Sequence, residues 1–455
     1  MPCCAATAAN TNFPEYPTIS KNIKFWEKIY AVYSLQQAVI HDSEDLSRIY
    51  QVVNLVDLDT PGAQRQNGAI QKQACERYKA LLEKLAETPP GSPEEQRVAG
   101  LFPGKNGRAE MAAAAENVRS QSGQKERFLA GVIKSGEYLG EIKNILQSYG
   151  LPPELAHLPH VESSFNYKAY SRIGAAGLWQ FTRDTGKQYL TVNNVIDERL
   201  DPIASTHAAA KYLAKSYQQL NNWPLAITSY NYGLAGMLRA VDEHTTYENI
   251  FNNYKKGHFK FASKNFYAEF LAARNVAQYL EKTIDRPTAK ATHRYLNLTV
   301  HADIRELARY YNIPVETLAD LNPALRPPIL KGEKRIPAGY KLRLPLLDKT
   351  PQLAKARQPA PAQNEQRVGR GYQVRQGDTA AGIARLHGIS LKSLVQANNL
   401  DQAATIRPGQ KLVIPENAVP ANTERQATGK TTRINIQKNV TTKDTLPPKE
   451  GKKPS

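Results

Sequence analysis

Apolar residues recur at helical spacing through most of the first 285 residues of the chain. From about residue 17 to residue 149 the pattern is that of successive helices, interrupted by Pro and Gly at 89–91 and at 103–104. One apolar stripe covers residues 25–33 and a second covers 46–55. Stripes of this kind are usually packed faces, so we expect the N-terminal part of the chain to be a helical extension.

Residues 151–165 combine a short helical pattern with a carboxylate near its end. Pro152 and Pro153 suit the opening of a helix, where a missing N–H costs nothing, and Glu162 falls near the last turn. Apolar neighbours and the negative end of the helix dipole both disfavour an ionised carboxylate there. Glu162 could therefore stay protonated near neutral pH and act as a general acid, although an ordinary solvated or ion-paired glutamate is the alternative.

Two further segments carry chemistry downstream of this helix. Residues 174–180 contain two glycines that allow a tight bend and the close approach of a ligand, and Gln180 offers an amide donor and acceptor. Asp201 and Pro202 are typical of the start of a helix, and a long amphipathic pattern follows them. A short helix then carries Tyr230, whose ring could stack on a sugar while its hydroxyl bonds a carboxyl or acetamido group.

The chain is organised differently after about residue 290. Residues 294–346 read as a strand, two helices and a closing strand, and residues 371–416 repeat this plan with a Gly377-Asp378-Thr379 turn after the first strand. Between them, 347–370 is rich in Pro, Ala, Gln and basic residues, which indicates a flexible tether. The tail after 416 is polar and basic without an apolar period, so we expect disorder and contact with anionic polymers.

Composition narrows the class of protein. With 41% hydrophobic and 22% charged residues in 455, the chain is globular, and its formal net charge of +18 predicts attraction to acidic polymers without choosing among them. No apolar run reaches the length of a membrane span, and the start of the chain lacks the pattern of a secretion signal. Three cysteines without repeated spacing argue against a disulfide framework or a zinc site, so we expect no metal and no cofactor.

Three motifs stand in order along the chain: Glu-Ser-Ser-Phe at 162–165, Gly-Ala-Ala-Gly-Leu-Trp-Gln-Phe at 174–181 and Ser-Tyr-Asn-Tyr-Gly at 229–233. Together they resemble the signature of the lytic transglycosylase and goose-type lysozyme superfamily. The wider run, which includes Leu158-Pro159 and Asp201-Pro202, is similar to the membrane-bound lytic transglycosylase D group. The second strand-helix-helix-strand unit resembles a LysM domain, and the first resembles it less because it lacks the Gly-Asp-Thr element.

The resemblance implies a mainly α fold, with a lysozyme-like helical catalytic domain followed by small β-α-α-β modules of LysM type. The expected domains are an N-terminal helical extension (1–111), which could lengthen a glycan groove, a transglycosylase catalytic domain (112–290), a degenerate LysM-like unit (294–346), a linker (347–370), a LysM glycan-binding domain (371–416) and a basic disordered tail (417–455). Whether the first LysM-like unit binds glycan stays open.

The resemblance also implies a reaction on peptidoglycan. Glu162 would protonate the oxygen between N-acetylmuramic acid and N-acetylglucosamine, the acetamido group of the sugar would stabilise the cationic centre, and the ionised Glu162 would then take a proton from the C6 hydroxyl, which attacks C1. The product is a 1,6-anhydromuramyl end, formed without water. By motif position the substrate-binding residues would be Ser171 at the acetamido group, Gln180 at the glycan or the acid, and Tyr230 and Asn231 at the reacting sugar.

The number of carboxylates leaves an alternative open. Most glycosidases use two carboxylates, whereas only Glu162 lies inside these motifs, and the Glu-Thr-x-Asn-Tyr element of many relatives is replaced by Ser-Lys-Asn-Phe-Tyr at 263–267. Asn265 and Tyr267 could still help to close the cleft. The nearest other acids downstream are expected to be solvated: Asp184, Asp197 and Glu198. If one of them reached the substrate, lysozyme-type hydrolysis would compete, and a binding protein without catalysis is a further alternative.

The expected partners are peptidoglycan strands, bound in part through a LysM loop at Gly377, Asp378 and Thr379, and anionic envelope polymers, bound through the basic tail. Nucleic acid is not expected, because no module that binds it is recognised, and the oligomeric state is not predicted. The resemblance implies an exported, periplasmic protein. Cys3 and Cys4 could be the remnant of a lipoprotein junction, which would anchor the protein to an outer membrane, or two incidental thiols.

Overall fold

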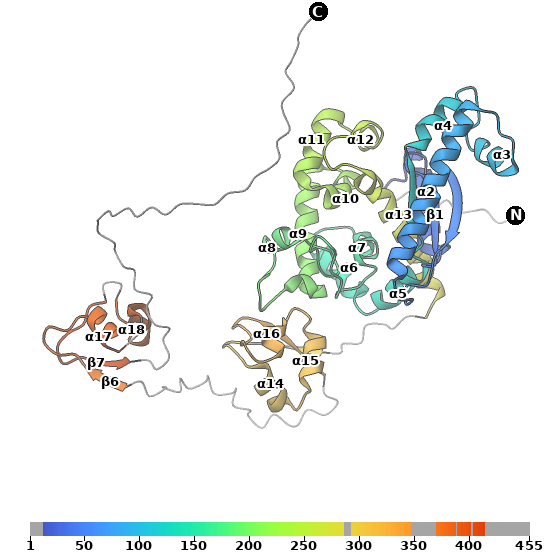
Figure 1. Ribbon diagram of the computed structural model, residues 1–455. Helices are drawn as coiled ribbons and strands as arrows, with labels where there is room; N and C mark the ends of the chain where they lie inside the picture. The colour runs from blue at the N-terminus through green and yellow to red at the C-terminus, as the bar shows by residue number, and fades with distance from the viewer. Residues whose placement is uncertain (1–11, 286–292, 347–369, 388, 402–403, 415–455) are drawn as a thin grey trace, which may run out of the picture. The chain divides into compact units, whose positions relative to one another are not determined.

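The computed structural model describes residues 12–285, 293–346, 370–387, 389–401 and 404–414 (Figure 1). Cys3 and Cys4, almost all of the predicted linker and the predicted basic tail lie outside these residues. The chain divides between Thr350 and Pro351 into two compact units.

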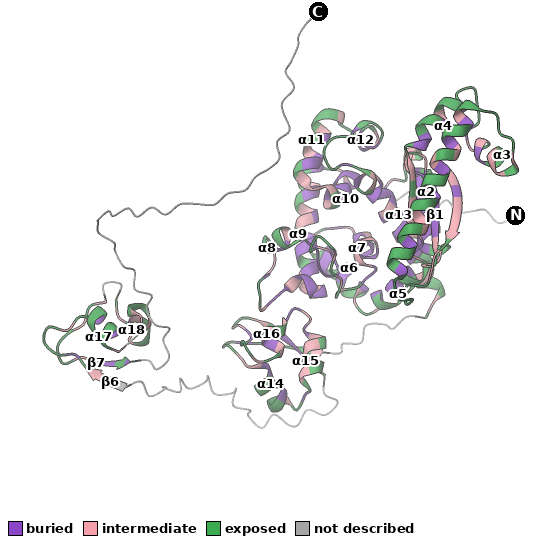
Figure 2. Ribbon diagram, in the orientation of Figure 1, coloured by how far each residue is buried: buried purple, intermediate pink, exposed green. Residues whose placement is uncertain are grey.

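A helical body fills most of the first unit. Its last helix, α13 (Phe261–Thr283), packs against α1 (Ser20–Ala31), α7 (Leu158–Ser163) and α10 (Trp223–Tyr232). The first seven residues of α10, 223–229, are buried, and Figure 2 shows buried residues in purple along the helices of this body. The remaining α-helices of the body are α5 (Lys125–Ser135), α6 (Leu139–Ser148), α8 (Arg183–Lys187), α9 (Pro202–Leu220), α11 (Leu234–His244) and α12 (Tyr247–Asn253), and its 3₁₀ turns are Pro17–Ile19, Pro153–His157 and Glu198–Leu200.

The N-terminal part contains a sheet as well as helices, so the helical pattern predicted at 46–55 was wrong for that stretch. Strands β1 (Gln37–Asp42), β2 (Ile49–Asn54) and β3 (Val118–Ser122) form an antiparallel sheet in the order β2-β1-β3. Helix α2 (Ala63–Glu87) lies along this sheet (Figure 1) and packs with α3 (Pro93–Ala99) and α4 (Gly107–Ala115).

The apolar spacing at 46–55 predicted a helix where the structure has a strand, because both faces of the sheet are covered. On β1, Val39 belongs to the core of the helical body, while the next residue, Ile40, belongs to a separate core beneath α2. On β2, Val52 packs against the first core and Tyr50 lies in the second. A strand buried on both faces shows no alternation of apolar and polar residues, and its apolar run resembles a helical stripe.

The first β-α-α-β module, residues 293–346, has the predicted plan with one additional short helix. Strands β4 (His293–Asn297) and β5 (Lys341–Pro345) pair antiparallel, and they enclose α14 (Ile304–Tyr311), α15 (Val315–Leu321) and α16 (Pro327–Leu330). The core of the module also takes in Ile196, which belongs to the helical body. The module is therefore packed onto the body within the first compact unit.

The second module, residues 370–414, forms the described part of the second unit. Strands β6 (Arg370–Gln373) and β7 (Lys411–Ile414) pair antiparallel around α17 (Ala380–Leu386) and α18 (Leu391–Ala397). This is the predicted β-α-α-β plan, so the fold class expected from the sequence is confirmed. Among the described residues, no helix combines the length and the apolar character that crossing a membrane requires.

Candidate active site

Glu162 lies in the last turn of α7, as the sequence predicted. The two prolines that open the segment are followed by a 3₁₀ turn and then by α7, whose first residues are buried. The helix ends because Ser164 and Phe165 adopt left-handed backbone conformations with φ of 49° and 56°. Phe165 is fully buried and anchors this end of the helix, while Glu162 stays half-buried.

The pKa of Glu162 is raised to about 8, first by burial and then by the negative charge of Glu269. No hydrogen bond to the Glu162 carboxylate is found among the described residues, so no hydrogen bond there stabilises its ionised form. At neutral pH the side chain is mostly a neutral carboxylic acid. It can therefore donate a proton.

Glu269 on α13 was missed by the sequence analysis. Its neighbours Ala268 and Phe270 are fully buried, and α13 packs against α7 at this level of the body. Burial raises the pKa of Glu269 to about 8, while the positive charge of Arg119 acts in the opposite direction. The sequence did offer a signal: Glu269 is the one acid in the largely apolar run at 265–273. An ionised carboxylate buried in such surroundings is energetically unfavourable.

Tyr230 approaches the acid from α10. Burial, followed by the charge of Glu162, raises the pKa of Tyr230 well above its usual value. Its hydroxyl donates a 2.8 Å hydrogen bond to the carbonyl of Trp179, and its ring packs edge-on against Tyr212 at 5.3 Å. The Tyr230 hydroxyl thus holds the Gly-rich loop against α10.

The loop at 169–181 is shaped by its own polar groups. The Ser171 hydroxyl accepts a 3.0 Å hydrogen bond from the Ala175 N–H, and the Gln180 side-chain amide donates a 2.8 Å bond to the Gly177 carbonyl. Gly177 has φ of 80°, and a Cβ there would lie 1.6 Å from the Arg199 carbonyl oxygen, so only glycine fits. Ser163, beside the acid, donates from its hydroxyl to the Leu178 carbonyl at 2.9 Å.

These contacts bring the three sequence motifs together. Ser163 links the acid's helix to the loop, and Tyr230 links the loop to α10. Asn231 lies beside Tyr230 on the exposed side of α10, where its carbonyl oxygen accepts a 2.7 Å hydrogen bond from the Ser263 hydroxyl of α13. Nothing in these contacts tests whether Ser171, Gln180, Tyr230 or Asn231 binds a glycan, and those roles stay predictions.

Three other expectations about polar residues need correction. Asn265 and Tyr267 do not border an opening, because both are fully buried and bond Asn22 and the Pro14 carbonyl respectively. Asp197 is not solvated: it is buried and forms a two-point ion pair with Arg199, at 2.8 and 2.9 Å.

The predicted LysM loop is held by contacts inside the second module. Gly377 has φ of 92°, and the Asp378 carboxylate accepts hydrogen bonds from the Arg375 N–H at 2.7 Å and the Tyr372 hydroxyl at 2.9 Å. These bonds lower the pKa of Asp378, the Arg375 bond most. Thr379 caps α17 through the Gly382 N–H. The three residues thus shape the turn, and their contact with glycan stays a prediction.

One group in the described part of the chain has donor atoms spaced closely enough for a metal ion: His157, His160 and Glu281, whose atoms lie within 4.8 Å of one another. The His157 Nδ1 lies 3.6 Å from a Glu281 carboxylate oxygen. This arrangement equally suits an ion pair between a protonated imidazole and a carboxylate, so we assign no metal to it. The expectation of no metal stays a prediction.

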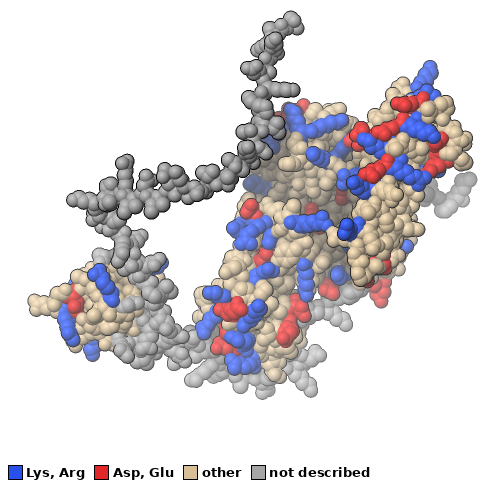
Figure 3. Space-filling view, in the orientation of Figure 1, with Lys and Arg blue, Asp and Glu red and all other residues tan. Residues whose placement is uncertain are grey.

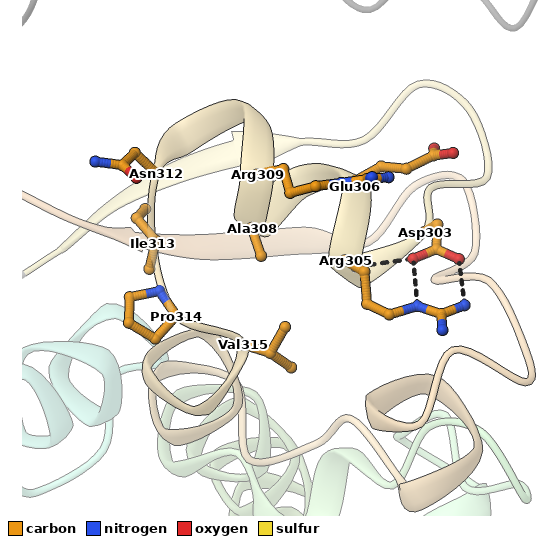
Figure 4. A pocket seen from close by; sticks show the side chains of 9 residues that line it. All are labelled: Asp303, Arg305, Glu306, Ala308, Arg309, Asn312, Ile313, Pro314 and Val315. Carbon is orange, nitrogen blue, oxygen red and sulfur yellow. Dashed lines mark hydrogen bonds and ion pairs between the residues drawn. The ribbon is translucent and has the colours of Figure 1, made fainter.

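A cavity of about 790 Å³ lies on the first module rather than beside Glu162. Figure 4 shows it between the Asp303–Arg305 ion pair at one end and Pro314 and Val315 at the other. Its lining runs from Asp303, which caps α14, to Val315, the first residue of α15, and does not include Glu162. On the face drawn in Figure 3, basic and acidic side chains of the first unit are interspersed rather than gathered into one basic patch.

Comparison with known families defines two domains in this chain. Residues 141–252 match the model described as Transglycosylase SLT domain, and residues 372–415 match the LysM domain model. The chain thus carries a transglycosylase SLT domain, which contains Glu162, the Gly-rich loop and Tyr230, and a C-terminal LysM domain.

Curated proteins also match parts of this chain. The chain is 26% identical over 310 residues to membrane-bound lytic murein transglycosylase D of Escherichia coli K12, which covers 64% of this chain and 68% of that protein. It is 37% identical over 106 residues to a putative tributyltin chloride resistance protein of Alteromonas sp. strain M-1, covering 23% of this chain and 51% of that one. Among solved structures, the 70 kDa soluble lytic transglycosylase of Escherichia coli aligns with a TM-score of 0.25 and 17% identity over 52% of this chain and 38% of that chain.

Proposed function

We propose that the protein is a peptidoglycan lytic transglycosylase in which Glu162 acts as both general acid and general base. The observation that carries the proposal is a protonated, half-buried carboxylic acid at the end of α7, joined through Ser163 and Tyr230 to the two other motifs of an SLT domain. A general acid must hold its proton at the working pH, and burial of Glu162 meets that requirement.

In the proposed reaction, Glu162 donates its proton to the oxygen of the β-1,4 bond between N-acetylmuramic acid and N-acetylglucosamine. The bond from that oxygen to C1 breaks, the oxygen leaves as a hydroxyl on the N-acetylglucosamine, and the acetamido group of the muramic sugar stabilises the positive charge at C1. The Glu162 carboxylate then accepts the proton of the C6 hydroxyl while the C6 oxygen bonds to C1. Glu162 ends the cycle protonated, and the product is a 1,6-anhydromuramyl end.

The surroundings of Glu162 support this double role. A carboxyl with a pKa of about 8 is a weak enough acid to be protonated before the reaction, and a basic enough carboxylate to recover a proton afterwards. The loop residues Ser171 and Gln180 are held by hydrogen bonds to nearby backbone groups, so the loop is ordered before substrate binds. In the proposed complex they contact the acetamido group and the glycan.

A second candidate function is lysozyme-type hydrolysis, and Glu269 is the observation that favours it. Glycosidases that activate water use two carboxylates, and Glu269 supplies a second one that acts on Glu162 electrostatically. Against it, the pKa of Glu269 is itself raised to about 8, so this carboxyl is mostly protonated at neutral pH and is a poor base there. We therefore favour the transglycosylase reaction.

The proposed role of the LysM domain is to hold the enzyme on its insoluble substrate. A glycan-binding module on the same chain raises the local concentration of catalytic domain at the wall without new catalytic contacts. The presence of this domain and the similarity to a membrane-bound murein transglycosylase support a place in the bacterial cell envelope. A lipid anchor at Cys3 or Cys4 and wall contacts of the basic tail belong to the same proposal.

The test is mass spectrometry of the muropeptides that the protein releases from purified peptidoglycan. The proposed reaction predicts anhydromuramyl ends from the wild type and none from Glu162→Gln. Reducing ends would instead indicate hydrolysis. If neither protein released material while both bound the wall, the protein would be a binding protein and the enzymatic proposal would fail.

A further inference from the structure

The first β-α-α-β module is joined to the SLT domain by backbone hydrogen bonds. The Asp197 N–H donates to the Ala324 carbonyl at 2.8 Å, and the Arg326 N–H donates to the Val195 carbonyl at 3.0 Å. Between these two bonds, Ile196 is buried in the core of the module. A segment of the catalytic domain thus forms one wall of the module.

A buried ion pair reinforces the junction. Arg343 of β5 makes a two-point contact with the Asp201 carboxylate at 2.5 and 2.7 Å, and both residues are only 7% exposed. The same carboxylate caps α9 by accepting from the Ile203 and Ala204 N–H groups. Removal of either partner alone would leave the other charge buried without its counter-charge, which is costly.

The module also reaches the Gly-rich loop of the catalytic domain. The Arg326 guanidinium donates a 2.7 Å hydrogen bond to the Tyr170 hydroxyl and lies over its ring, 5.7 Å from the centroid. The Tyr170 side chain is 50% exposed. The next residue is Ser171, a predicted substrate-binding residue, and Tyr170 itself forms a β-bridge with Ala176 across the loop.

A second connection runs through buried charges. The Tyr170 hydroxyl also donates to Asp197 at 3.4 Å, and Asp197 is paired with Arg199. Arg199 in turn donates to the carbonyls of Gly174 at 2.8 Å and Phe181 at 3.1 Å, which lie in the loop and just after Gln180. Contacts made by Arg326, Asp197 and Arg199 therefore hold the loop at Tyr170, at Gly174 and at Phe181.

We propose that Arg326 is a positioning residue for catalysis, through which the first module holds the Tyr170–Gly177 side of the loop in its substrate-binding conformation. The inference rests on the proposed function, because it assigns the loop to the glycan. It gives the first module a different task from the second: the first is a fixed part of the catalytic unit, and the second is the wall-binding module. Arg326 touches no reacting atom in this account and acts through Tyr170.

The test compares the wild-type 455-residue chain with Arg326→Met, Tyr170→Phe, the double variant and Arg309→Met. Methionine keeps the packing of Arg326 and removes its hydrogen bond and charge. Arg309 is the matched control, because it is an exposed arginine of α14 on the same module. Two quantities are measured: the kinetics of release from soluble, uncrosslinked glycan strands, and hydrogen exchange of the loop amides of Ser171, Gly174, Ala176 and Gly177, each of which donates within the loop.

The proposal predicts that Arg326→Met lowers kcat about tenfold with little change in KM, as expected for a lost charge-assisted hydrogen bond that positions a reacting site. Tyr170→Phe should lower kcat similarly. The double variant should lower kcat no further than the more affected single variant, because both substitutions remove the same hydrogen bond between Arg326 and Tyr170. Exchange of the four loop amides should rise in Arg326→Met, while α14 and α15 keep wild-type protection. Arg309→Met should change neither quantity.

The positioning role is refuted if Arg326→Met matches Arg309→Met in both kcat and loop exchange, or if its rate loss is accompanied by exposure of the whole module. Multiplicative losses in the double variant would also refute it. Failure of the proposed function looks different: wild type and Glu162→Gln would then release the same products or none. The exchange measurement needs no activity, so it still decides whether Arg326 orders the loop.

Discussion

The Tyr230 hydroxyl donates a 2.8 Å hydrogen bond to the carbonyl of Trp179, and this single bond joins the third sequence motif to the second. Trp179 is completely buried, and its indole N–H donates to the Thr206 hydroxyl of α9 at 2.9 Å. The residue that follows it is Gln180, with a left-handed backbone at φ of 50°. The bond from Tyr230 therefore fixes the backbone next to Gln180, a proposed substrate-binding residue.

Tyr230→Phe tests this relationship. Removal of the hydroxyl leaves the Trp179 carbonyl without its partner, and we expect a loss of about 1–3 kcal/mol in the free energy of unfolding, measured by urea denaturation. We also expect slower glycan release because the loop is less well ordered. Tyr232→Phe is the control: its hydroxyl makes longer bonds, at 3.2 and 3.3 Å, and its loss should cost less than about 0.5 kcal/mol. Equal effects of the two variants would contradict the account.

Glu269→Gln should change the pH dependence of the reaction. The charge of Glu269 is the second cause of the raised pKa of Glu162, so its removal should lower that pKa while burial still keeps it above the ordinary value. Activity requires a protonated Glu162 and falls as pH rises through its pKa. The alkaline limb of the profile should therefore move to lower pH in this variant. Glu243→Gln, at an exposed site paired with Lys256, should leave the limb in place.

The same variant should alter the stability of the fold with pH. The pKa of Glu269 rises from an ordinary 4.5 to about 8 on folding, so the native state binds this proton more tightly than the unfolded state. Its contribution to stability is greatest below the ordinary pKa and is lost as pH rises toward 8. Glu269→Gln should thus be less sensitive to pH than wild type between these values, as measured by thermal unfolding. A parallel pH dependence would show that the carboxyl is not buried as described.

Two glycines of the loop make a matched pair of substitutions. Gly174 and Gly177 both have positive φ, 79° and 80°, but a Cβ at Gly174 meets nothing within 4 Å, whereas at Gly177 it would lie 1.6 Å from the Arg199 carbonyl oxygen. Gly174→Ala should cost about 1–2 kcal/mol of unfolding free energy from backbone strain alone. Gly177→Ala should cost about 3 kcal/mol or more, because the backbone must also move. Equal costs in urea denaturation would contradict the close approach of Arg199.

Local sequence signals predicted the elements that carry the site. The two prolines before Leu158 and the end of α7 placed Glu162 in a last turn, and the Asp201-Pro202 pair marked the first residues of α9. These features depend on residues within one or two helical turns of each other, so they can be recognised without knowledge of the tertiary fold. The motif order then placed Glu162, the loop and Tyr230 in one site, which the hydrogen bonds of Ser163 and Tyr230 support.

What the sequence did not predict depends on contacts between distant segments. Glu269 is a solitary acid on an apolar helix face, and only the packing of α13 on α7 makes it a neighbour of Glu162. Arg343 and Asp201 are 142 positions apart, so their pairing, and with it the docking of the first module, carries no local signal. At 46–55, burial of β2 between two cores removed the alternation that identifies a strand.

The central claim is that Glu162 is the only residue required to transfer protons in a cleavage that excludes water. The most direct measurement is mass spectrometry of products released from purified peptidoglycan in water enriched in the heavy oxygen isotope, by wild type and by Glu162→Gln. We predict anhydromuramyl ends without incorporated label from the wild type and no release by the variant. Labelled reducing ends, or equal release by Glu162→Gln, would contradict the account.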